Sequence, residues 1–321
     1  MRRETPDWRP SATLQTLRAR AELYGSVRAF FSARGMLEVD TPILSIHATV
    51  DRHIESFAVA SPVSRLPSPD LWLHTSPEFA MKRLLAAGSG PIWQIAHVFR
   101  REECGRHHNP EFSLLEWYRP GFDHHRLMDE MEELLRAVGV HAQAFERLSY
   151  GEAFRHHAGL DPFAAPLEQL RAAVRVENVS PEESQDRDFW LDVIMSSLVG
   201  PKLGHATPTF LCDFPASQAA LSRVRGGVAE RFELFWRGIE LANGFHELTD
   251  AAEQQARFEA DQRWRSAHGR TVPPYDSNLI AALASGLPDC AGVALGLDRL
   301  LMLMLDLPDV ASTLAFDAGR A

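Results

Sequence analysis

The sequence has few cysteines, no excess of positive charge and no long apolar run. Only Cys104, Cys212 and Cys290 occur in 321 residues, and their odd number and wide spacing argue against a disulfide framework. The 33 arginines and lysines are outnumbered by 43 aspartates and glutamates, so the net charge of −10 excludes a broadly basic nucleic-acid binder. The most apolar stretch, residues 292–305, is interrupted by two charged residues and is shorter than the ~20 residues that span a bilayer.

The N-terminal ten residues are polar and acidic in part, and no apolar signal segment follows them. Together with the scarcity of cysteine, this predicts a cytoplasmic protein that does not enter a membrane. Hydrophobic residues make up 45% and charged residues 24% of the chain, which is typical of a folded globular protein with a sizeable core.

Hydrophobic periodicity predicts alternating groups of helices and strands. A first helix is expected after Ser11, its N-cap, and ends near Gly35, while Ser149 and Glu152 match a capping box. Strands are expected at residues 71–74, 92–101, 111–118, 210–214, 231–235 and 238–242, with a final strand–turn–helix over 290–305. Because most strands are linked as hairpins, we predict an α+β fold: an antiparallel sheet flanked by helices, in one domain over 1–321, with a mainly helical insertion at about 150–205.

Three glutamates, Glu233, Glu240 and Glu247, follow one another at intervals of seven residues. A tight turn at Trp236 and Arg237 would place Glu233 directly opposite Glu240, where like charges repel unless a cation lies between them. Carboxylate oxygens without thiolates suit magnesium. The alternative is a pair of solvated glutamates on an exposed edge.

Two further segments combine charge with glycine or aromatic residues. In the first hairpin, Arg100 and Glu102 precede a polar loop at 103–110 that could grip a polyphosphate, although a solvated hairpin has the same pattern. Residues 292–299 combine a glycine-containing strand with Arg299 at the start of a helix, and backbone donors with a guanidinium suit a phosphate or a flat base. Taken singly, such strand–helix turns are usually packing devices.

The order of these segments resembles the three motifs of class II aminoacyl-tRNA synthetases. The matching strings are Gly35 to Pro42, then Phe99-Arg-Arg-Glu102 with His108-Asn-Pro-Glu-Phe112, then Gly292 to Arg299. Within that class the chain looks most like lysyl-tRNA synthetase, through Ser76-Pro77-Glu78, Glu116-Trp-Tyr118 and Glu240-Leu-Ala-Asn-Gly-Phe-His-Glu247. The resemblance covers nearly the whole chain and implies a class II catalytic domain.

The resemblance also implies that lysine is activated as an aminoacyl-adenylate with ATP and Mg²⁺. Arg100 would be catalytic, bridging the lysine carboxylate and the α-phosphate, and so would Arg299, which would hold the γ-phosphate. The implied ATP-binding residues are Arg100, Glu102, His108, Asn109, Phe112, Glu240, Leu241, Gly296 and Arg299. The implied substrate-binding residues are Ser76, Pro77, Glu78, Glu116, Tyr118, Asn243, Phe245, Glu247 and Ala294, and the implied magnesium ligands are Glu233 and Glu240.

Two departures from lysyl-tRNA synthetases bear on the acceptor. The first helix begins near residue 11, which leaves no room for an N-terminal anticodon-binding OB domain, and Ala294 stands where lysyl-tRNA synthetases have glycine. Both look like the truncated paralogues of lysyl-tRNA synthetase that ligate lysine, preferentially (R)-β-lysine, to elongation factor P. The resemblance therefore implies elongation factor P as acceptor in place of tRNA, and a homodimer through the segment that resembles motif 1. The alternatives are a lysyl-adenylate former acting on tRNA or a small molecule, and a regulator without catalysis.

Overall fold

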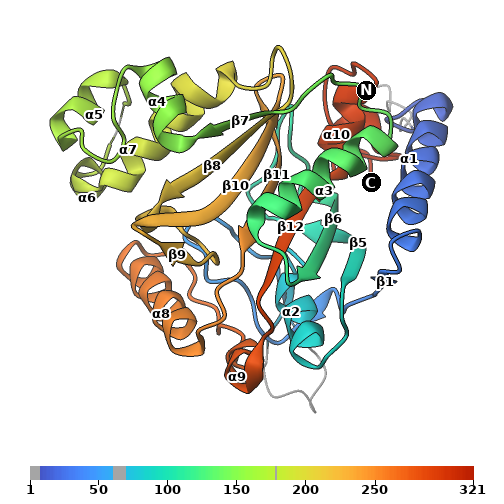
Figure 1. The fold of residues 1–321 in the computed structure, drawn as a ribbon, viewed down its shortest axis with the longest axis horizontal. Coiled ribbons are helices and arrows are strands. Elements are labelled where there is room, and N and C mark those ends of the chain that lie inside the picture. The colour runs from blue at the N-terminus through green and yellow to red at the C-terminus, as the bar shows by residue number, and fades with distance from the viewer. Residues whose placement is uncertain (1–7, 61–69, 178) are drawn as a thin grey trace, which may run out of the picture. The chain divides into compact units, whose positions relative to one another are not determined.

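The computed structural model describes residues 8–60, 70–177 and 179–321 (Figure 1). The helices are α1 (Leu14–Ser32), α2 (Glu78–Ala86), α3 (His124–Ala137), α4 (Tyr150–Ala158), α5 (Leu167–Ala173), α6 (Pro181–Gln185), α7 (Arg187–Ile194), α8 (Ala251–Ala267), α9 (Ser277–Gly286) and α10 (Leu297–Met304). The strands are β1 (Leu37–Glu38), β2 (Leu44–Ser45), β3 (Ala58–Ala60), β4 (Asp70–Leu73), β5 (Ile92–Phe99), β6 (Glu111–Pro120), β7 (Glu146–Ser149), β8 (Thr209–Pro215), β9 (Val224–Arg225), β10 (Val228–Trp236), β11 (Ile239–His246) and β12 (Cys290–Gly296). None of the described helices combines the length and apolar character needed to cross a bilayer.

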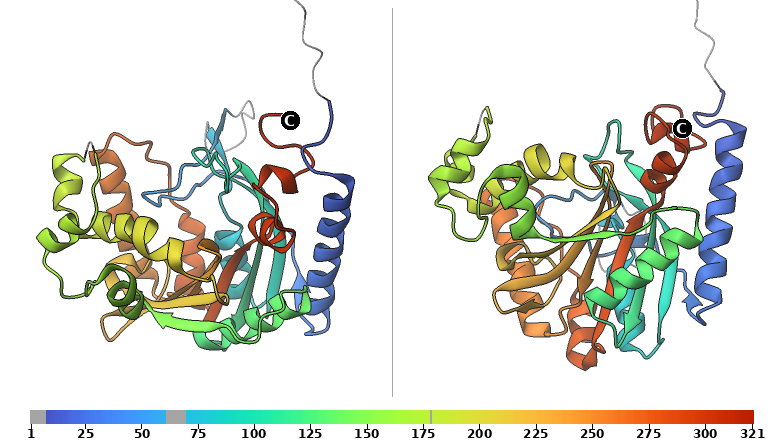
Figure 2. Two further views of the ribbon diagram at one scale, coloured as in Figure 1. Left: turned by 90° about the horizontal axis from the view of Figure 1, so that it is seen from above. Right: turned by 45° about the horizontal axis from the view of Figure 1, so that its top comes forward.

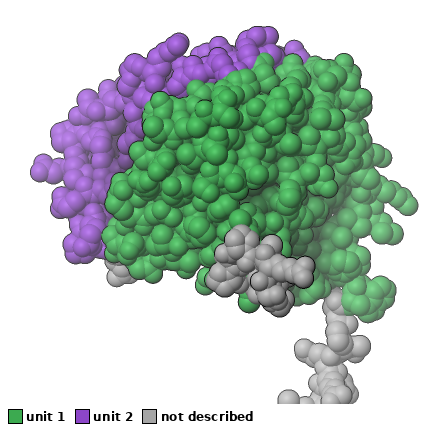
Figure 3. All heavy atoms as spheres, turned by 90° about the horizontal axis from the view of Figure 1, so that it is seen from below, with its two compact units in different colours: residues 1–120, 249–288, 295–321 green, residues 121–248, 289–294 purple. Residues whose placement is uncertain are grey.

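The chain divides into two compact units, coloured separately in Figure 3. The first contains residues 1–120, 249–288 and 295–321, and the second contains residues 121–248 and 289–294. Each unit carries part of the predicted set of functional residues. The single domain expected from the sequence stays a prediction.

In the first unit, β5 and β6 form the predicted hairpin and pair antiparallel in register from Ile92 opposite Tyr118 to Phe99 opposite Glu111. The short strand β1 lies beside β5 in parallel orientation. Helix α10 packs against β6 and α1. Both views of Figure 2 show α1 beside the C-terminal segment. A small sheet in the order β2-β4-β3 and the helices α2, α8 and α9 complete this unit.

In the second unit, β8, β10 and β11 form an antiparallel sheet, and β7 pairs with β8 in parallel orientation. Helix α3 packs on β10 and β11. The segment expected as a helical insertion contains α4 to α7, whose core includes Phe154, Trp190 and Leu191 packed against Phe214 of β8. The two parallel edge pairs, β1 with β5 and β7 with β8, were not predicted, because strands of two to four residues carry almost no periodic signal.

The ends of the helices test the capping predictions. The predicted N-cap Ser11 is wrong: Thr13 caps α1 by accepting from the Thr16 amide at 3.1 Å, and Ser11 donates to Asp317 at 2.6 Å instead. The capping box of Ser149 and Glu152 is confirmed at the start of α4. Serine and threonine both suit an N-cap, so residue type alone does not decide between Ser11 and Thr13. Tertiary contacts decide.

Candidate functional site

The first unit places the side chains of Ser76, Glu116 and Tyr118 together. Ser76 precedes α2, where its hydroxyl accepts from the Glu78 amide at 3.0 Å and donates to Glu116 Oε1 at 2.6 Å. The Tyr118 hydroxyl lies 3.4 Å from Glu116 Oε2 on the same strand. Pro77 is the N-cap residue of α2, which begins at Glu78. Two predicted substrate-binding segments, residues 76–78 and 116–118, therefore meet at one carboxylate.

Glu116 is buried among these partners, with 1% of its surface exposed. Burial, and the negative charge of Glu78, raise the pKa of Glu116 to about 8, because both disfavour a carboxylate in the interior. A carboxyl group in this state is mostly protonated at neutral pH. When an ammonium group lies next to it, the carboxyl group loses its proton and binds the ammonium as a carboxylate.

Glu78, the first residue of α2, pairs with Lys82 at 2.6 Å, one helical turn along. The Lys82 side chain is buried with 2% exposure, whereas the Glu78 carboxylate is 15% exposed. The pair was not anticipated, although a four-residue spacing between glutamate and lysine is a common helical signal.

Arg100, the first arginine of the string Phe99-Arg-Arg-Glu102, lies in the turn after β5. The Arg100 guanidinium lies 3.0 Å from Glu103 and 5.1 Å from the centre of the Phe112 ring, which places a cation on an aromatic face. Glu102 lies outside the strand, is 62% exposed and approaches Arg270 at 3.6 Å. The expected strand over 92–101 is two residues too long, because β5 ends at Phe99 and Arg100 lies beyond it.

Arg299 lies on α10 and contacts the hairpin loop, since its guanidinium donates to the His107 carbonyl at 3.1 Å and to His108 Nε2 at 2.6 Å. Asn109 follows and donates to the Glu111 carbonyl at 2.6 Å, so its side chain shapes the loop. Gly296 precedes α10 as its N-cap, without a side chain that could cap the helix. Thus Arg299 and His108, which are 191 residues apart in sequence, are neighbours in the structure.

In the second unit, the predicted register of the two glutamates is wrong. Glu233 pairs with Asn243, whereas Glu240 pairs with Phe235, and the register shifts between Leu234 and Phe235. The turn lies at Arg237 and Gly238, one residue later than expected, and both residues have positive φ angles of 51° and 75°. A two-residue turn of this kind matches the twist of the flanking strands.

The negative charge of Glu240 nonetheless acts on Glu233. Burial raises the pKa of Glu233 above its usual range, Arg231 opposes this shift, and the negative charge of Glu240 adds to it. Glu233 is 8% exposed and Glu240 is partly exposed, and two carboxylates that repel each other favour a divalent cation between them. The residues present therefore fit a magnesium ion.

Arg231 is a residue that the sequence analysis missed. Its guanidinium pairs with Glu233, donates to Asn243 at 3.2 Å and to the Gln218 carbonyl at 2.8 Å, and lies 4.4 Å from the centre of the Phe214 ring. Its spacing of two residues from Glu233, on the same face of a strand, was the available signal.

The remaining predicted residues of this unit lie on β11, just after it, or on β12. Asn243 and Phe245 share a face of β11 by alternation and are partly exposed, whereas Leu241 and Glu247 are buried. Ala294 is half-buried on β12.

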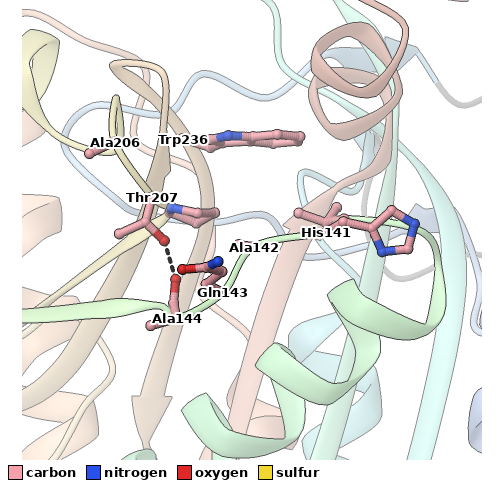
Figure 4. Close-up of a pocket in the computed structure, with 9 residues that line it drawn as sticks. His141, Ala142, Gln143, Ala144, Ala206, Thr207 and Trp236 are labelled. Carbon is pink, nitrogen blue, oxygen red and sulfur yellow. Dashed lines mark hydrogen bonds between the residues drawn. The ribbon is translucent and has the colours of Figure 1, made fainter.

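A separate cavity of about 460 Å³ lies in the second unit, between residues 140–144, residues 206–208 and Trp236 (Figure 4). Its walls combine the Trp236 ring and the side chains of His141 and Gln143 with smaller residues, and Thr207 donates to the Ala144 carbonyl there. Its lining contains none of the predicted ATP, lysine or magnesium residues.

The family model described as tRNA synthetases class II (D, K and N) matches residues 1–319. The chain belongs to the class II tRNA synthetases. Among members of this class, it is 49% identical to proteins named elongation factor P–(R)-β-lysine ligase from Salmonella gallinarum, Salmonella dublin and Salmonella paratyphi B. The matches cover 99% of this class II synthetase chain and 99% of each relative.

Proposed function

We propose that the chain activates lysine, with (R)-β-lysine as the preferred isomer, as an aminoacyl-adenylate and transfers it to a lysine side chain of elongation factor P. The similarity to proteins of that name along almost their whole length is the observation that carries this proposal. The contact of Ser76 and Tyr118 with the buried Glu116 supports a pocket for an amine. The pairing of Arg299 with His108 supports a binding place for phosphate.

The first half-reaction needs charge stabilisation more than proton transfer. A lysine carboxylate is already ionised at neutral pH, so it attacks the α-phosphorus of ATP without a general base and pyrophosphate leaves. Arg100 would neutralise the negative charge that shifts onto the α-phosphate, and Phe112 would stack on adenine. Arg299 and His108 would hold the terminal phosphates, while Glu102 would contact the adenine amino group.

Magnesium would be held by Glu233 and Glu240, and when bound it supplies Lewis-acid neutralisation of the phosphates. Arg231 orients Glu233 through their ion pair. The resemblance assigns the path of the methylenes and the distal amine to Asn243, Phe245 and Glu247. It also assigns Glu116 and Tyr118 to the distal amine. Glu78 would receive the ammonium group nearer the carboxylate, and Ser76 and Pro77 would fix the start of α2 beside it.

A pyrophosphate-exchange assay with ATP and either (R)-β-lysine or α-lysine tests the activation step directly. Exchange that depends on β-lysine is expected in the absence of any acceptor. A regulator without catalysis would show no exchange with either isomer. An adenylate former with another acceptor would show exchange and leave elongation factor P unmodified.

Lysine binding is expected to release a proton through Glu116. Because the pKa of Glu116 is about 8 without substrate, the group is mostly protonated at pH 7, and an incoming ammonium favours its carboxylate form. Calorimetry of β-lysine binding in two buffers of different ionisation enthalpy should therefore reveal the release of close to one proton at pH 7, and less at pH 8.5.

Glu116→Gln should abolish this proton release and weaken binding. Glu111→Gln, which changes an exposed glutamate at the start of the same strand, should leave both unchanged. A binding enthalpy for the unaltered chain that is independent of the buffer at pH 7 would contradict the role given to Glu116.

Ala294→Gly is expected to raise the activation of α-lysine relative to β-lysine. A single methyl group in a pocket that does not relax is worth roughly 10- to 200-fold in discrimination. The ratio of kcat/KM for the two isomers in the exchange assay measures the effect. Equal losses for both isomers would show that Ala294 only packs the sheet.

A two-fold homodimer through α1 and the following arm is expected, since apolar side chains lie exposed there. Leu37 is 55% exposed, and Ile43 and Leu44 are each 43% exposed. In a two-fold interface this patch of one chain faces the same patch of the other, so glutamates introduced there repel each other. Light scattering at micromolar concentration should give the dimer mass for the unaltered chain and the monomer mass for Ile43→Glu/Leu44→Glu. A monomeric unaltered chain would overturn this expectation.

A further inference from the structure

A cluster of two histidines and a glutamate lies in the second unit, on a face of β11 opposite to Asn243 and Phe245. His124 is the first residue of α3, Glu230 belongs to β10 and His246 ends β11. One potential ligand atom from each of the three lies within 4.8 Å of the other two. Strand alternation turns His246 away from the side chains assigned above to the lysine pocket, so the cluster is a separate feature of the fold.

The local structure aims these side chains at one point. Asp123 caps α3 by accepting from the Arg126 amide at 2.8 Å, which fixes His124 at the first helical position over β10 and β11. The register of β10 against β8 shifts between Ala229 and Phe232, and such an irregularity re-aims the residues within it, here Glu230.

His124 is buried with 5% exposure, yet neither of its ring nitrogens has a hydrogen-bond partner. A buried imidazole without partners is costly, and native proteins rarely leave both nitrogens unsatisfied. Burial, and the neighbouring His125, lower the pKa of His124 to about 4, so the ring is neutral at pH 7 and offers a lone pair.

His246 is held as a metal-binding histidine would be. Its Nε2 lies 2.9 Å from Asp289 Oδ1, and its Nδ1 lies 2.6 Å from Glu230 Oε2 without hydrogen-bond geometry. A carboxylate on one ring nitrogen fixes the tautomer that leaves the other nitrogen free to coordinate. Arg223 pairs with Asp289 and thereby holds that carboxylate in place.

We propose that His124, His246 and Glu230 bind one divalent transition-metal ion of the zinc class, with Asp289 orienting His246. Two imidazole nitrogens and one carboxylate oxygen suit Zn²⁺ and leave a fourth position for water, whereas Mg²⁺ prefers oxygen ligands alone. The ion would join the start of α3 to β10 and β11. Its positive charge would also offset the negative charges of Asp123 and Asp213, both of which raise the pKa of His124.

The test uses the full-length chain without an affinity tag, stripped with a chelator and titrated with Zn²⁺ against a chromophoric competitor in the presence of Mg²⁺. One tight Zn²⁺ per chain is expected, together with a rise in Tm on addition of Zn²⁺. Cobalt in place of zinc should give the visible absorption bands of a low-coordinate site. Tight binding is the deciding outcome, since the chain has 14 histidines that add weak background sites.

His124→Gln and Glu230→Gln should each weaken Zn²⁺ binding by at least 100-fold, and Asp289→Asn by roughly 10- to 100-fold. His125→Gln, which changes the exposed neighbour of His124, is the matched control and should bind as the unaltered chain does. If one glutamine variant fails to fold, the other decides. Binding to the unaltered chain that is no tighter than to Glu230→Gln, or an equal loss in His125→Gln, overturns the proposal.

Discussion

Glu240→Gln is expected to reduce adenylate formation by roughly 10²- to 10⁴-fold, the range that several kcal/mol of charge stabilisation represents. The substitution keeps the shape of the side chain but removes one of the two carboxylates proposed to hold magnesium. It also removes the charge that raises the pKa of Glu233. Pyrophosphate exchange at saturating ATP and several magnesium concentrations measures the loss.

The matched control for this experiment is Glu182→Gln, which changes an exposed glutamate of α6 and should exchange normally. Thermal unfolding separates a lost site from a lost fold, because Glu240→Gln should unfold close to the unaltered chain in the absence of ligands. Near-normal exchange by Glu240→Gln would remove Glu240 from the magnesium site.

Arg100→Ala is expected to lower kcat for activation by roughly 10²- to 10³-fold, the cost of losing one positioned donor at a developing negative charge. Arg100 lies beside Phe112 and Glu103, so the substitution also removes the cation from the aromatic face. Single-turnover adenylate formation distinguishes this loss from weaker ATP binding. Arg101→Ala, which changes the exposed neighbouring arginine, should behave as the unaltered chain. Equal rates for the two variants would contradict the role of Arg100.

Helices were the most predictable part of the fold, because their ends carry chemical signals. The capping box at Ser149 and the turn at Gly35 were recognised from residue type, and α1 (Leu14–Ser32) lies within the range expected between Ser11 and Gly35. The N-cap of α1 was displaced by two residues, since Ser11 is used by Asp317 from the far end of the chain. Such a long-range contact leaves no local trace in the sequence.

Strand register was less predictable, and the candidate site shows why. The seven-residue spacing of Glu233 and Glu240 indicated a shared hairpin, but the bulge after Leu234 and the turn at Arg237 and Gly238 moved Glu240 away from the opposite position. A Cβ on Gly238 would lie 2.8 Å from the Pro201 carbonyl oxygen, so the turn depends on packing against another segment. One residue of slip reassigns every cross-strand neighbour.

The cluster of His124, Glu230 and His246 was invisible to sequence reasoning. Its members lie on one helix and two strands, with separations of 106 and 16 residues that match no metal-binding motif. Only the register of β10 and β11 and the placement of α3 bring their ligand atoms together.

The intact mass of elongation factor P tests the central proposal most directly. Unmodified elongation factor P would be incubated with the chain, ATP, Mg²⁺ and (R)-β-lysine, and a parallel sample would contain Arg100→Ala. The proposed function predicts a mass increase of one β-lysyl residue, confined to a single lysine of elongation factor P and strongly reduced in the Arg100→Ala sample. An unchanged mass of elongation factor P, in a sample where pyrophosphate exchange with β-lysine proceeds, would contradict elongation factor P as the acceptor.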